Sequence, residues 1–508
     1  MGVIVKEGAR NAVILYLGAA LGAVNTILLY PKLMTKSEYG VITILTSIAL
    51  LVAGLSSFGS STSIIKYLPS YRIEEKKSNQ GLLTFLIFLS MIFSLLTVGV
   101  LVFFKDTVLQ PFEGGAALLV KYYYFIIPLF LASLLLELFS GYSNGLLKTT
   151  FQLFLKEVFL RMGQFVLILL YYYKAINFDG FIIFYVLIYF LSFLILFTFL
   201  LLKGELSFAY FGGIPIKERW EILKFGGYSF FSSIAATLAF RIDTLMVSAL
   251  LVSAVNVNEG LDAAAVYVVA LNIAAVIDMP FRAIGQIVNP MISKYWNVKD
   301  LDAIHEVYKK TTETMVIIGA FVFIGIWACI SDIVAILPSD YKEVKYVFLW
   351  LGIGKFINVA CGSNAAIIIN SKYYRFFTLM TFIALLLTVI TNFIFINYWG
   401  ITGAALATAL TYLIVNFIMF YFLYYKFKLQ PFKVNNLVSM LVALIVYVLF
   451  FNIDLNNPWI NIATKGILIS LTYWMIVVKL SLSNDINAFL SKQPLIKKIV
   501  EVPKGNKI

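Results

Sequence analysis

Apolar runs of about 20 residues recur along the whole chain, and this feature constrains its fold more than any other. A helix of that length matches the hydrocarbon thickness of a bilayer. Lipid requires each backbone polar group to find its partner within its own segment or in a closed barrel, so such runs predict helices. Only 13% of the 508 residues are charged and 61% are apolar. This composition excludes a water-soluble surface and predicts an all-α integral membrane protein.

The apolar runs predict about 14 transmembrane helices, and the first is expected to remain as a span because it is too long for a signal-peptide core. Placing the amino terminus in the cytoplasm puts about 25 Lys and Arg in cytoplasmic loops and tails, against about eight on the other side. This bias predicts that both termini are cytoplasmic, and it explains the net charge of +13 without nucleic acid. The predicted segments lie near 10–34, 38–63, 81–104, 117–141, 150–173, 179–203, 224–252, 262–293, 312–337, 343–370, 375–397, 400–425, 434–452 and 458–480.

A weak internal repeat relates the first six predicted spans to the next six. Asn25 in the first span aligns with Asp243 in the seventh, and Gly180 aligns with Gly400 once the second copy's longer loop, 252–261, is allowed for. Such an arrangement is typical of transporters with two lobes related by an axis along the membrane normal. The predicted parts are two pseudo-symmetric six-helix lobes over 1–210 and 211–430, two extra transmembrane helices over 431–482, and a basic cytoplasmic tail over 483–508.

Two short stretches resemble the signatures of polysaccharide-export flippases. The first is the segment from Pro31 to Gly40 after the first span, and the second joins Glu221–Gly226 to Arg241–Met246. On these motifs the chain is similar to the Wzx-type O-antigen and capsule flippases of the multidrug/oligosaccharidyl-lipid/polysaccharide exporter superfamily. The resemblance implies two six-helix lobes, often followed by two more helices, and a lipid-linked sugar as cargo.

The motifs of common catalytic sites are missing from the sequence. Gly352–Phe356 lacks the first glycine and the hydroxyl of a nucleotide-binding loop, and no metalloprotease or hydrolase motif occurs. His305 lies in a charged segment and is expected at the surface. Cys329 and Cys361 fall in apolar runs and are expected to pack as small core residues. The sequence therefore predicts no enzyme activity, no cofactor and no metal site.

Ionisable residues inside the apolar runs are the candidates for function, because a charge near the bilayer centre is costly unless it is paired or faces water. Guanidinium and ammonium groups suit a diphosphate headgroup, and buried carboxylates suit a coupling proton or sodium ion. Asp278 and Arg282, four residues apart, equally fit a simple salt bridge on one helix face. The expected substrate-binding residues are Arg241, Arg282, Lys355, Arg161 and Lys156, and the expected ion-coupling residues are Asp243, Asp278 and Glu137.

These features together predict a flippase that works by alternating access in a bacterial cytoplasmic (inner) membrane. It would move a polyprenyl-diphosphate-linked oligosaccharide from the cytoplasmic to the outer leaflet for surface polysaccharide assembly, driven by an ion gradient or by the membrane potential. A cation-coupled multidrug exporter and a membrane-embedded glycosyltransferase or polymerase remain as alternatives. We expect a monomer whose partners are the lipid-linked oligosaccharide and membrane lipids, with a polysaccharide polymerase or glycosyltransferases as further candidates.

Overall fold

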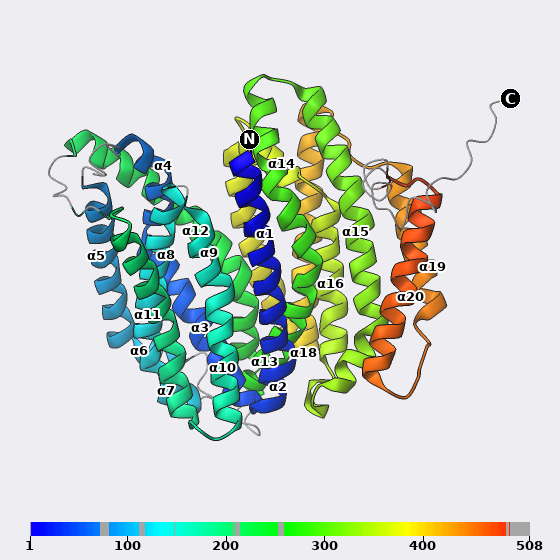
Figure 1. Ribbon diagram of the computed structural model, residues 1–508, viewed down its shortest axis with the longest axis horizontal. Coiled ribbons are helices and arrows are strands. Elements are labelled where there is room, and N and C mark those ends of the chain that lie inside the picture. The colour runs from blue at the N-terminus through cyan, green and yellow to red at the C-terminus, as the bar shows by residue number, and fades with distance from the viewer. Residues whose placement is uncertain are drawn as a thin grey trace. The chain divides into compact units, whose positions relative to one another are not determined.

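The computed structural model describes residues 2–71, 81–110, 117–146, 148–206, 208, 214–251, 259–483 and 487, and within these ranges it is helical without any strand (Figure 1). The chain forms two compact units. Unit 1 comprises Met1–Val269 and Thr388–Ile401, and unit 2 comprises Ala270–Leu387 and Thr402–Ile508. The boundaries predicted from the sequence stay a prediction. Most of the predicted tail over 483–508, and residues 252–258 of the enlarged loop, lie outside the described residues.

Unit 1 is built mainly from the helices of the first half of the chain. In chain order they are α1 (Gly2–Ala23), η1 (Val24–Leu29), α2 (Tyr30–Leu33), α3 (Lys36–Ser57), α4 (Ser60–Tyr71), α5 (Leu82–Phe103), α6 (Lys105–Leu109), α7 (Ala117–Tyr122), η4 (Tyr123–Phe125), α8 (Ile126–Gly145), α9 (Thr149–Phe154), η5 (Leu155–Phe159), α10 (Leu160–Tyr172), α11 (Phe178–Leu202), α12 (Ile216–Leu250) and α13 (Glu259–Ala275), which ends in unit 2. The π-helical turns η1 and η5 interrupt the first and fifth predicted spans.

Unit 2 contains the remaining helices, and its first turn breaks the eighth predicted span. In chain order they are η7 (Val276–Asp278), α14 (Met279–Asn297), α15 (Leu301–Ile336), η8 (Ser339–Tyr341), α16 (Val344–Ala360), α17 (Asn364–Asn370), α18 (Tyr374–Phe427), whose middle belongs to unit 1, α19 (Val434–Phe450) and α20 (Pro458–Lys479).

Each of the fourteen predicted segments coincides with helix in the structure. Nine of the described helices are long and apolar enough to cross a membrane, and a tenth span results if Ser339–Ala360 and Asn364–Asn370, bent by 51°, count as one. The helix α18 holds two of the predicted segments, and neither α12 nor α19 is among the nine. The all-helical membrane architecture is therefore confirmed, whereas the number of fourteen crossings stays a prediction.

The motif that precedes α3 has a structural explanation. Thr35 and Glu38 form a capping box, in which the Thr35 backbone donates to the Glu38 carboxylate over 3.0 Å and the Glu38 backbone donates to the Thr35 hydroxyl. Gly40 lies against the backbone of Leu261 in α13, and an added Cβ would stand 2.3 Å from the Leu261 carbonyl oxygen. The Thr35-to-Gly40 motif therefore starts one helix and allows another to approach it closely.

The 54-residue helix α18 changes direction at its middle. Its backbone is non-helical at Trp399 and Gly400, and the φ of +57° at Gly400 is one that glycine adopts without a steric penalty. Near the two ends of α18, the rings of Phe376 and Phe422 stack with centroids 4.1 Å apart. The two ends of α18 therefore lie side by side in unit 2.

The last two helices, α19 and α20, pack on α15, where Figure 1 shows them in orange and red. Val442, Val446 and Tyr473 are buried in this contact. A buried ion pair also joins α20 to α15, with Lys465 Nζ 2.6 Å from the Asp332 carboxylate. An ion pair of this kind satisfies two charges that would otherwise be costly within an apolar helix.

Candidate functional site

Arg241 in α12 is held by a neutral group of unit 1. Its guanidinium is half-buried and donates to the Ser47 hydroxyl of α3 over 3.4 Å, which is at the long end of the hydrogen-bond range. No carboxylate of the described residues lies within ion-pair distance of Arg241. A cation in this state keeps most of its donors for an anionic ligand.

Tyrosine hydroxyls surround the same region. Tyr185 and Tyr189 lie one turn apart on α11, and both interact electrostatically with Arg241. The Tyr185 hydroxyl is 3.2 Å from the Thr46 hydroxyl and accepts a hydrogen bond from Gln164 over 3.3 Å. These groups offer both donors and acceptors to a polar ligand.

Arg161 approaches this group from α10. It interacts electrostatically with Tyr189 and forms an ion pair of 2.8 Å with Glu157, four residues before it. Its backbone carbonyl accepts a hydrogen bond of 2.7 Å from Asn25, at the π-helical turn of the first span. We define the arginine–tyrosine cluster as Arg241, Arg161, Tyr185, Tyr189, Ser47, Thr46 and Gln164.

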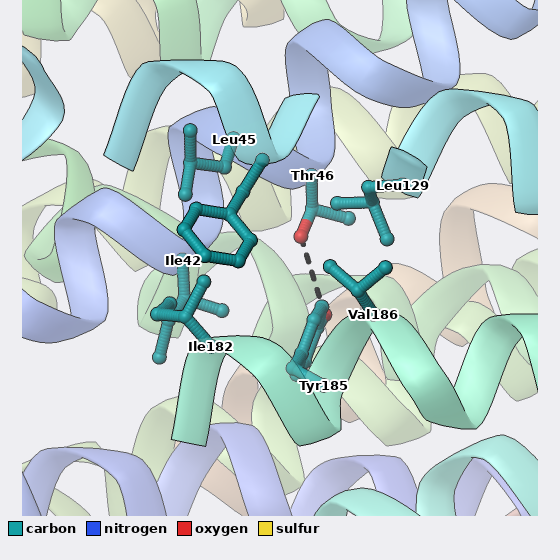
Figure 2. A pocket seen from close by; sticks show the side chains of 8 residues that line it. Ile42, Leu45, Thr46, Leu129, Ile182, Tyr185 and Val186 are labelled. Carbon is teal, nitrogen blue, oxygen red and sulfur yellow. Dashed lines mark hydrogen bonds between the residues drawn. The ribbon is translucent and has the colours of Figure 1, made fainter. Parts of the chain in front are cut away.

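A small pocket borders this cluster (Figure 2). Thr46 and Tyr185 supply its only hydroxyls, and the other lining side chains are apolar, among them Ile42, Leu129 and Val186. Its volume of about 10 Å³ is at most that of one water. The pocket itself is therefore too small for a sugar, and any cargo would need the surrounding helices to separate.

Asp243 lies two residues after Arg241 and has different partners. Its carboxylate is buried and accepts hydrogen bonds from the Tyr267 hydroxyl over 3.1 Å and from the Asn392 amide over 2.6 Å. The amide oxygen of Asn392 is buried without a hydrogen-bond partner. Arg241 and Asp243 therefore bind other helices rather than each other, as their spacing predicts.

Unit 2 contains a contrasting charged group. Lys355 in α16 and Asp278 in η7 form an ion pair of 2.7 Å, and their side chains are only 4% and 8% exposed. Lys355 also donates to the Tyr412 hydroxyl over 3.1 Å. The second carboxylate oxygen of Asp278 is buried and has no hydrogen-bond partner. The structure thus joins one expected substrate ligand to one expected coupling residue.

The alternative salt bridge between Asp278 and Arg282 is not formed, because Asp278 pairs with Lys355. Arg282, another expected substrate-binding residue, has different surroundings. Its side chain in α14 is exposed, and no ion pair involving it occurs in the described part of the chain. The break at η7 starts a new helix directly after Asp278, so the helix geometry assumed for the four-residue spacing does not hold there.

The remaining expected residues also pair with each other. Lys156 of η5 forms an ion pair with Glu137 of α8, and both side chains are substantially exposed. Exposed ion pairs of this type contribute little to stability. Lys156 and Glu137 are therefore partners of each other, and in the described residues neither forms an ion pair with the arginine–tyrosine cluster.

Several polar residues of the interior were not predicted. Lys465 and Asp332 are ionisable residues inside apolar runs, so the criterion applied to the other spans would have found them. Tyr185 and Tyr189 carry a weaker signal, a pair of tyrosines one helical turn apart in an otherwise apolar span. Asn392 has no distinguishing sequence pattern.

A family model described as "Polysaccharide biosynthesis protein" matches residues 4–296 of the chain. No protein with curated annotation matches the sequence. The matched region contains both motifs of the sequence resemblance, as well as Arg241, Asp243 and Arg282.

Solved structures share the fold. The lipid II flippase MurJ in an inward closed conformation matches with a TM-score of 0.72 and 16% identity, over 93% of this chain and 99% of that one. An inward-facing multidrug resistance transporter of the MATE family and MOP superfamily matches with a TM-score of 0.60 and 14% identity, over 81% and 93%. A MOP superfamily transporter from Pyrococcus furiosus matches with a TM-score of 0.55 and 14% identity, over 82% and 94%. At such identities the likeness concerns the fold alone.

Proposed function

Because the chain belongs to the polysaccharide biosynthesis protein family, we propose that it is a flippase for a polyprenyl-diphosphate-linked oligosaccharide. It is a membrane transport protein and not an enzyme. The cargo would pass from the cytoplasmic to the outer leaflet of a bacterial cytoplasmic membrane, by alternating access and without chemical change. Surface polysaccharide such as O-antigen or capsule would be its product.

The observation that carries this proposal is Arg241, a half-buried guanidinium that makes one long hydrogen bond, to a hydroxyl, among the described residues. A guanidinium binds phosphate oxygens through two parallel hydrogen bonds, and these are strong away from bulk water. Tyr185 and Tyr189 offer hydroxyls beside it for further phosphate or sugar oxygens. Arg161, in the same unit as Arg241 and near Tyr189, is an additional cation for the headgroup.

Asp243 is the better candidate for ion coupling, and Asp278 the weaker one. Asp278 already has its charge neutralised by Lys355. Asp243 accepts hydrogen bonds from the side chains of Tyr267 and Asn392, and the unpartnered amide oxygen of Asn392 lies next to it. A carboxylate with an adjacent amide oxygen is the type of ligand set that a hard cation prefers, and a carboxylate can also accept a proton.

The decisive experiment changes Arg241 in a strain that lacks its own flippase, with export followed as surface polysaccharide. Arg241→Lys keeps the charge and loses the planar fork, so we expect export to fall roughly tenfold or more at normal membrane abundance, which corresponds to about 1.5 kcal/mol or more of lost charge-assisted bonding. Arg241→Ala should abolish export. Unchanged export by Arg241→Ala would remove the diphosphate role.

The matched control is Arg219→Lys, another arginine of α12, whose guanidinium donates to a backbone carbonyl. It should export normally. The shared fold with multidrug transporters makes drug export the second candidate. Resistance of the same strain to cationic drugs is therefore measured in parallel, and resistance that depends on the chain while surface polysaccharide does not would favour that candidate.

A further inference from the structure

A long stretch in the second half of the chain has no acidic residue. Between Glu343 and Asp454 the sequence contains neither Asp nor Glu. Two of its cations are compensated by carboxylates from elsewhere, Lys355 by Asp278 and Lys433 by Glu313. The cations of this stretch are Lys345, Lys355, Lys372, Arg375, Lys426, Lys428 and Lys433.

Three of these lysines gather around tyrosine rings where the two ends of α18 meet. The amino groups of Lys372 and Lys426 lie 5.3 Å and 5.5 Å from the ring centre of Tyr373. Lys428 lies 5.8 Å from the rings of both Tyr424 and Tyr425. We define the lysine–tyrosine patch as Lys372, Tyr373, Tyr424, Tyr425, Lys426 and Lys428.

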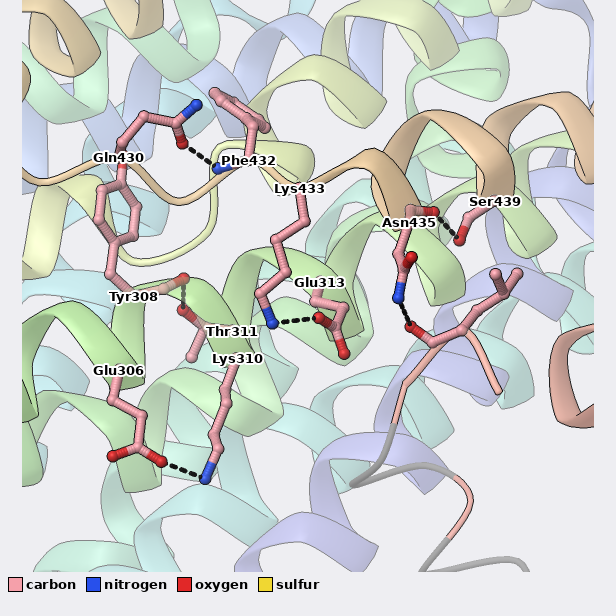
Figure 3. A network of polar contacts seen from close by, with 11 residues as sticks. Glu306, Tyr308, Lys310, Thr311, Glu313, Gln430, Phe432, Lys433, Asn435 and Ser439 are labelled. Atoms are coloured by element: carbon pink, nitrogen blue, oxygen red, sulfur yellow. Dashed lines mark hydrogen bonds and ion pairs between the residues drawn. The ribbon is translucent and has the colours of Figure 1, made fainter. Parts of the chain in front are cut away.

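The patch keeps its positive charge. In the part of the chain that the structure describes, no carboxylate lies within ion-pair distance of Lys372, Lys426 or Lys428. The acidic residues nearby are already engaged, Glu313 with Lys433 at 2.8 Å and Glu306 with Lys310 at 2.7 Å (Figure 3). A cation over a tyrosine ring still has ammonium hydrogens to donate, so the patch suits an anion.

An exposed apolar stripe leads up to the patch. Phe417, Tyr421 and Tyr425 follow one another at four-residue intervals on α18 and are 64%, 58% and 69% exposed. Side chains at this spacing lie on one helix face. Aromatic rings of this kind contact acyl chains and line the membrane interface. The stripe and the lysines therefore match the two parts of a phospholipid, its acyl chains and its headgroup.

The patch lies at the end of unit 2 that contains the carboxyl end of α20. His305 near the start of α15 hydrogen-bonds Gln430 over 2.9 Å, and Asn435 near the start of α19 donates to the Leu482 carbonyl after α20 over 3.2 Å. The segment after α18, which follows the patch, therefore lies at the same end as the residues that follow α20. The Lys and Arg bias of the sequence predicts that this end is cytoplasmic. Bacterial and eukaryotic cytoplasmic leaflets contain anionic lipids that attract such basic groups.

We propose that the lysine–tyrosine patch is a binding site for the headgroup of an anionic phospholipid of the cytoplasmic leaflet. The phosphodiester accepts hydrogen bonds from Lys372, Lys426 and Lys428, and its acyl chains lie along Phe417, Tyr421 and Tyr425. The site is separate from the cargo site and stands independently of it.

The test uses the purified full-length protein with phosphatidylglycerol or phosphatidylcholine added, and native mass spectrometry to count bound lipid. Wild type should bind phosphatidylglycerol more tightly than phosphatidylcholine. Each Lys→Gln change should weaken phosphatidylglycerol binding about fivefold, and the triple change K372Q/K426Q/K428Q more than tenfold. The triple Lys→Arg variant should bind like wild type, because it keeps the charges.

The control triple variant K174Q/K342Q/K345Q changes lysines outside the patch, of which Lys174 and Lys342 are exposed and Lys345 is half-buried, and it should leave binding unchanged. A second measurement needs no variant, since raising the salt from ~0.05 M to ~0.5 M should weaken phosphatidylglycerol binding to wild type. Equal affinity for the two lipids would overturn the site. An equal loss of phosphatidylglycerol binding in K372Q/K426Q/K428Q and in the control triple variant would also overturn it. So would binding of soluble pyrophosphate at the patch without a preference for lipid.

Discussion

Two of the pairs of opposite charges within the predicted spans have contrasting surroundings in the structure. Lys355 and Asp278 in unit 2 neutralise each other over 2.7 Å. Arg241 and Asp243 in unit 1 are two residues apart in sequence, yet the structure joins the first to a serine and the second to a tyrosine and an asparagine. Lys355 and Asp278 thus form an ion pair with each other, whereas Arg241 and Asp243 each form hydrogen bonds with polar side chains.

The difference follows from helix geometry. Residues two apart on a helix point about 200° apart, so Arg241 and Asp243 face different neighbours. Asp278 lies in a 3₁₀ turn at a break between helices, and Lys355 reaches it from α16. A neutralised pair is stable without any ligand, whereas a guanidinium held by one long hydrogen bond gains most from an anion. On the proposed function, we therefore expect Lys355 to contribute to stability and Arg241 to bind the cargo.

The largest expected effect is the loss of folding stability when Lys355 is changed alone. Lys355→Met leaves the Asp278 carboxylate buried without its partner, and such a loss costs about 3–5 kcal/mol. Arg241→Met should cost about 1 kcal/mol or less, because it removes one long bond to a neutral group. Thermal unfolding in detergent and membrane abundance measure both.

The double variant Lys355→Met with Asp278→Asn is the control for this prediction. It removes both charges, so much of the lost stability should return. If Arg241→Met proves as destabilising as Lys355→Met, the two cations have the same structural role and the comparison fails.

The next prediction concerns Ser47→Asp, which should give Arg241 a carboxylate partner like the one that Lys355 has in Asp278. Ser47→Asp places a carboxylate beside the guanidinium that the Ser47 hydroxyl contacts in the structure. The new ion pair should compete with the cargo diphosphate, so we expect export to fall about tenfold or more while the protein stays in the membrane. Surface polysaccharide and membrane abundance are measured together.

The neutral variant Ser47→Asn serves as the matched control and should export within about twofold of wild type, since its amide oxygen can still accept from Arg241 and it adds no charge that competes with the cargo. Normal export by Ser47→Asp would mean that the Arg241 guanidinium is not a cargo ligand.

The sequence predicts the helices well, because apolar runs of span length have few other stable conformations. Each of the fourteen predicted segments is mostly helical in the residues that the structure describes. The sequence does not predict the break at η7 or the π-helical turns η1 and η5, since local propensity is a weak guide where tertiary packing decides. The boundary predicted between the segments 375–397 and 400–425, by contrast, coincides with the non-helical backbone at Trp399 and Gly400.

The candidate site is predictable only in part. Charge in an apolar run identifies Arg241, Asp243, Asp278 and Lys355, because such residues are costly without a partner. Which partner each takes depends on contacts between distant helices, as for Lys355 with Asp278, and no spacing encodes these. Uncharged residues such as Tyr189 and Asn392 carry no penalty large enough to stand out in sequence.

The smallest change in stability is expected for Asp243→Asn, and it tests the other half of the comparison. Asparagine has nearly the shape of aspartate and keeps a carbonyl oxygen for Tyr267 or Asn392, so unfolding should change by about 1 kcal/mol or less. Export should nevertheless lose its response to an imposed sodium or proton gradient, because the amide neither takes up a proton nor carries the charge that holds a cation. Export is measured in membrane vesicles with and without each gradient, and wild type should respond to one of them.

Asp278→Asn is the counterpart, and it should lower stability by removing the ion pair with Lys355. A gradient response that survives in Asp243→Asn and disappears in the double variant Lys355→Met with Asp278→Asn would transfer the coupling role from Asp243 to Asp278.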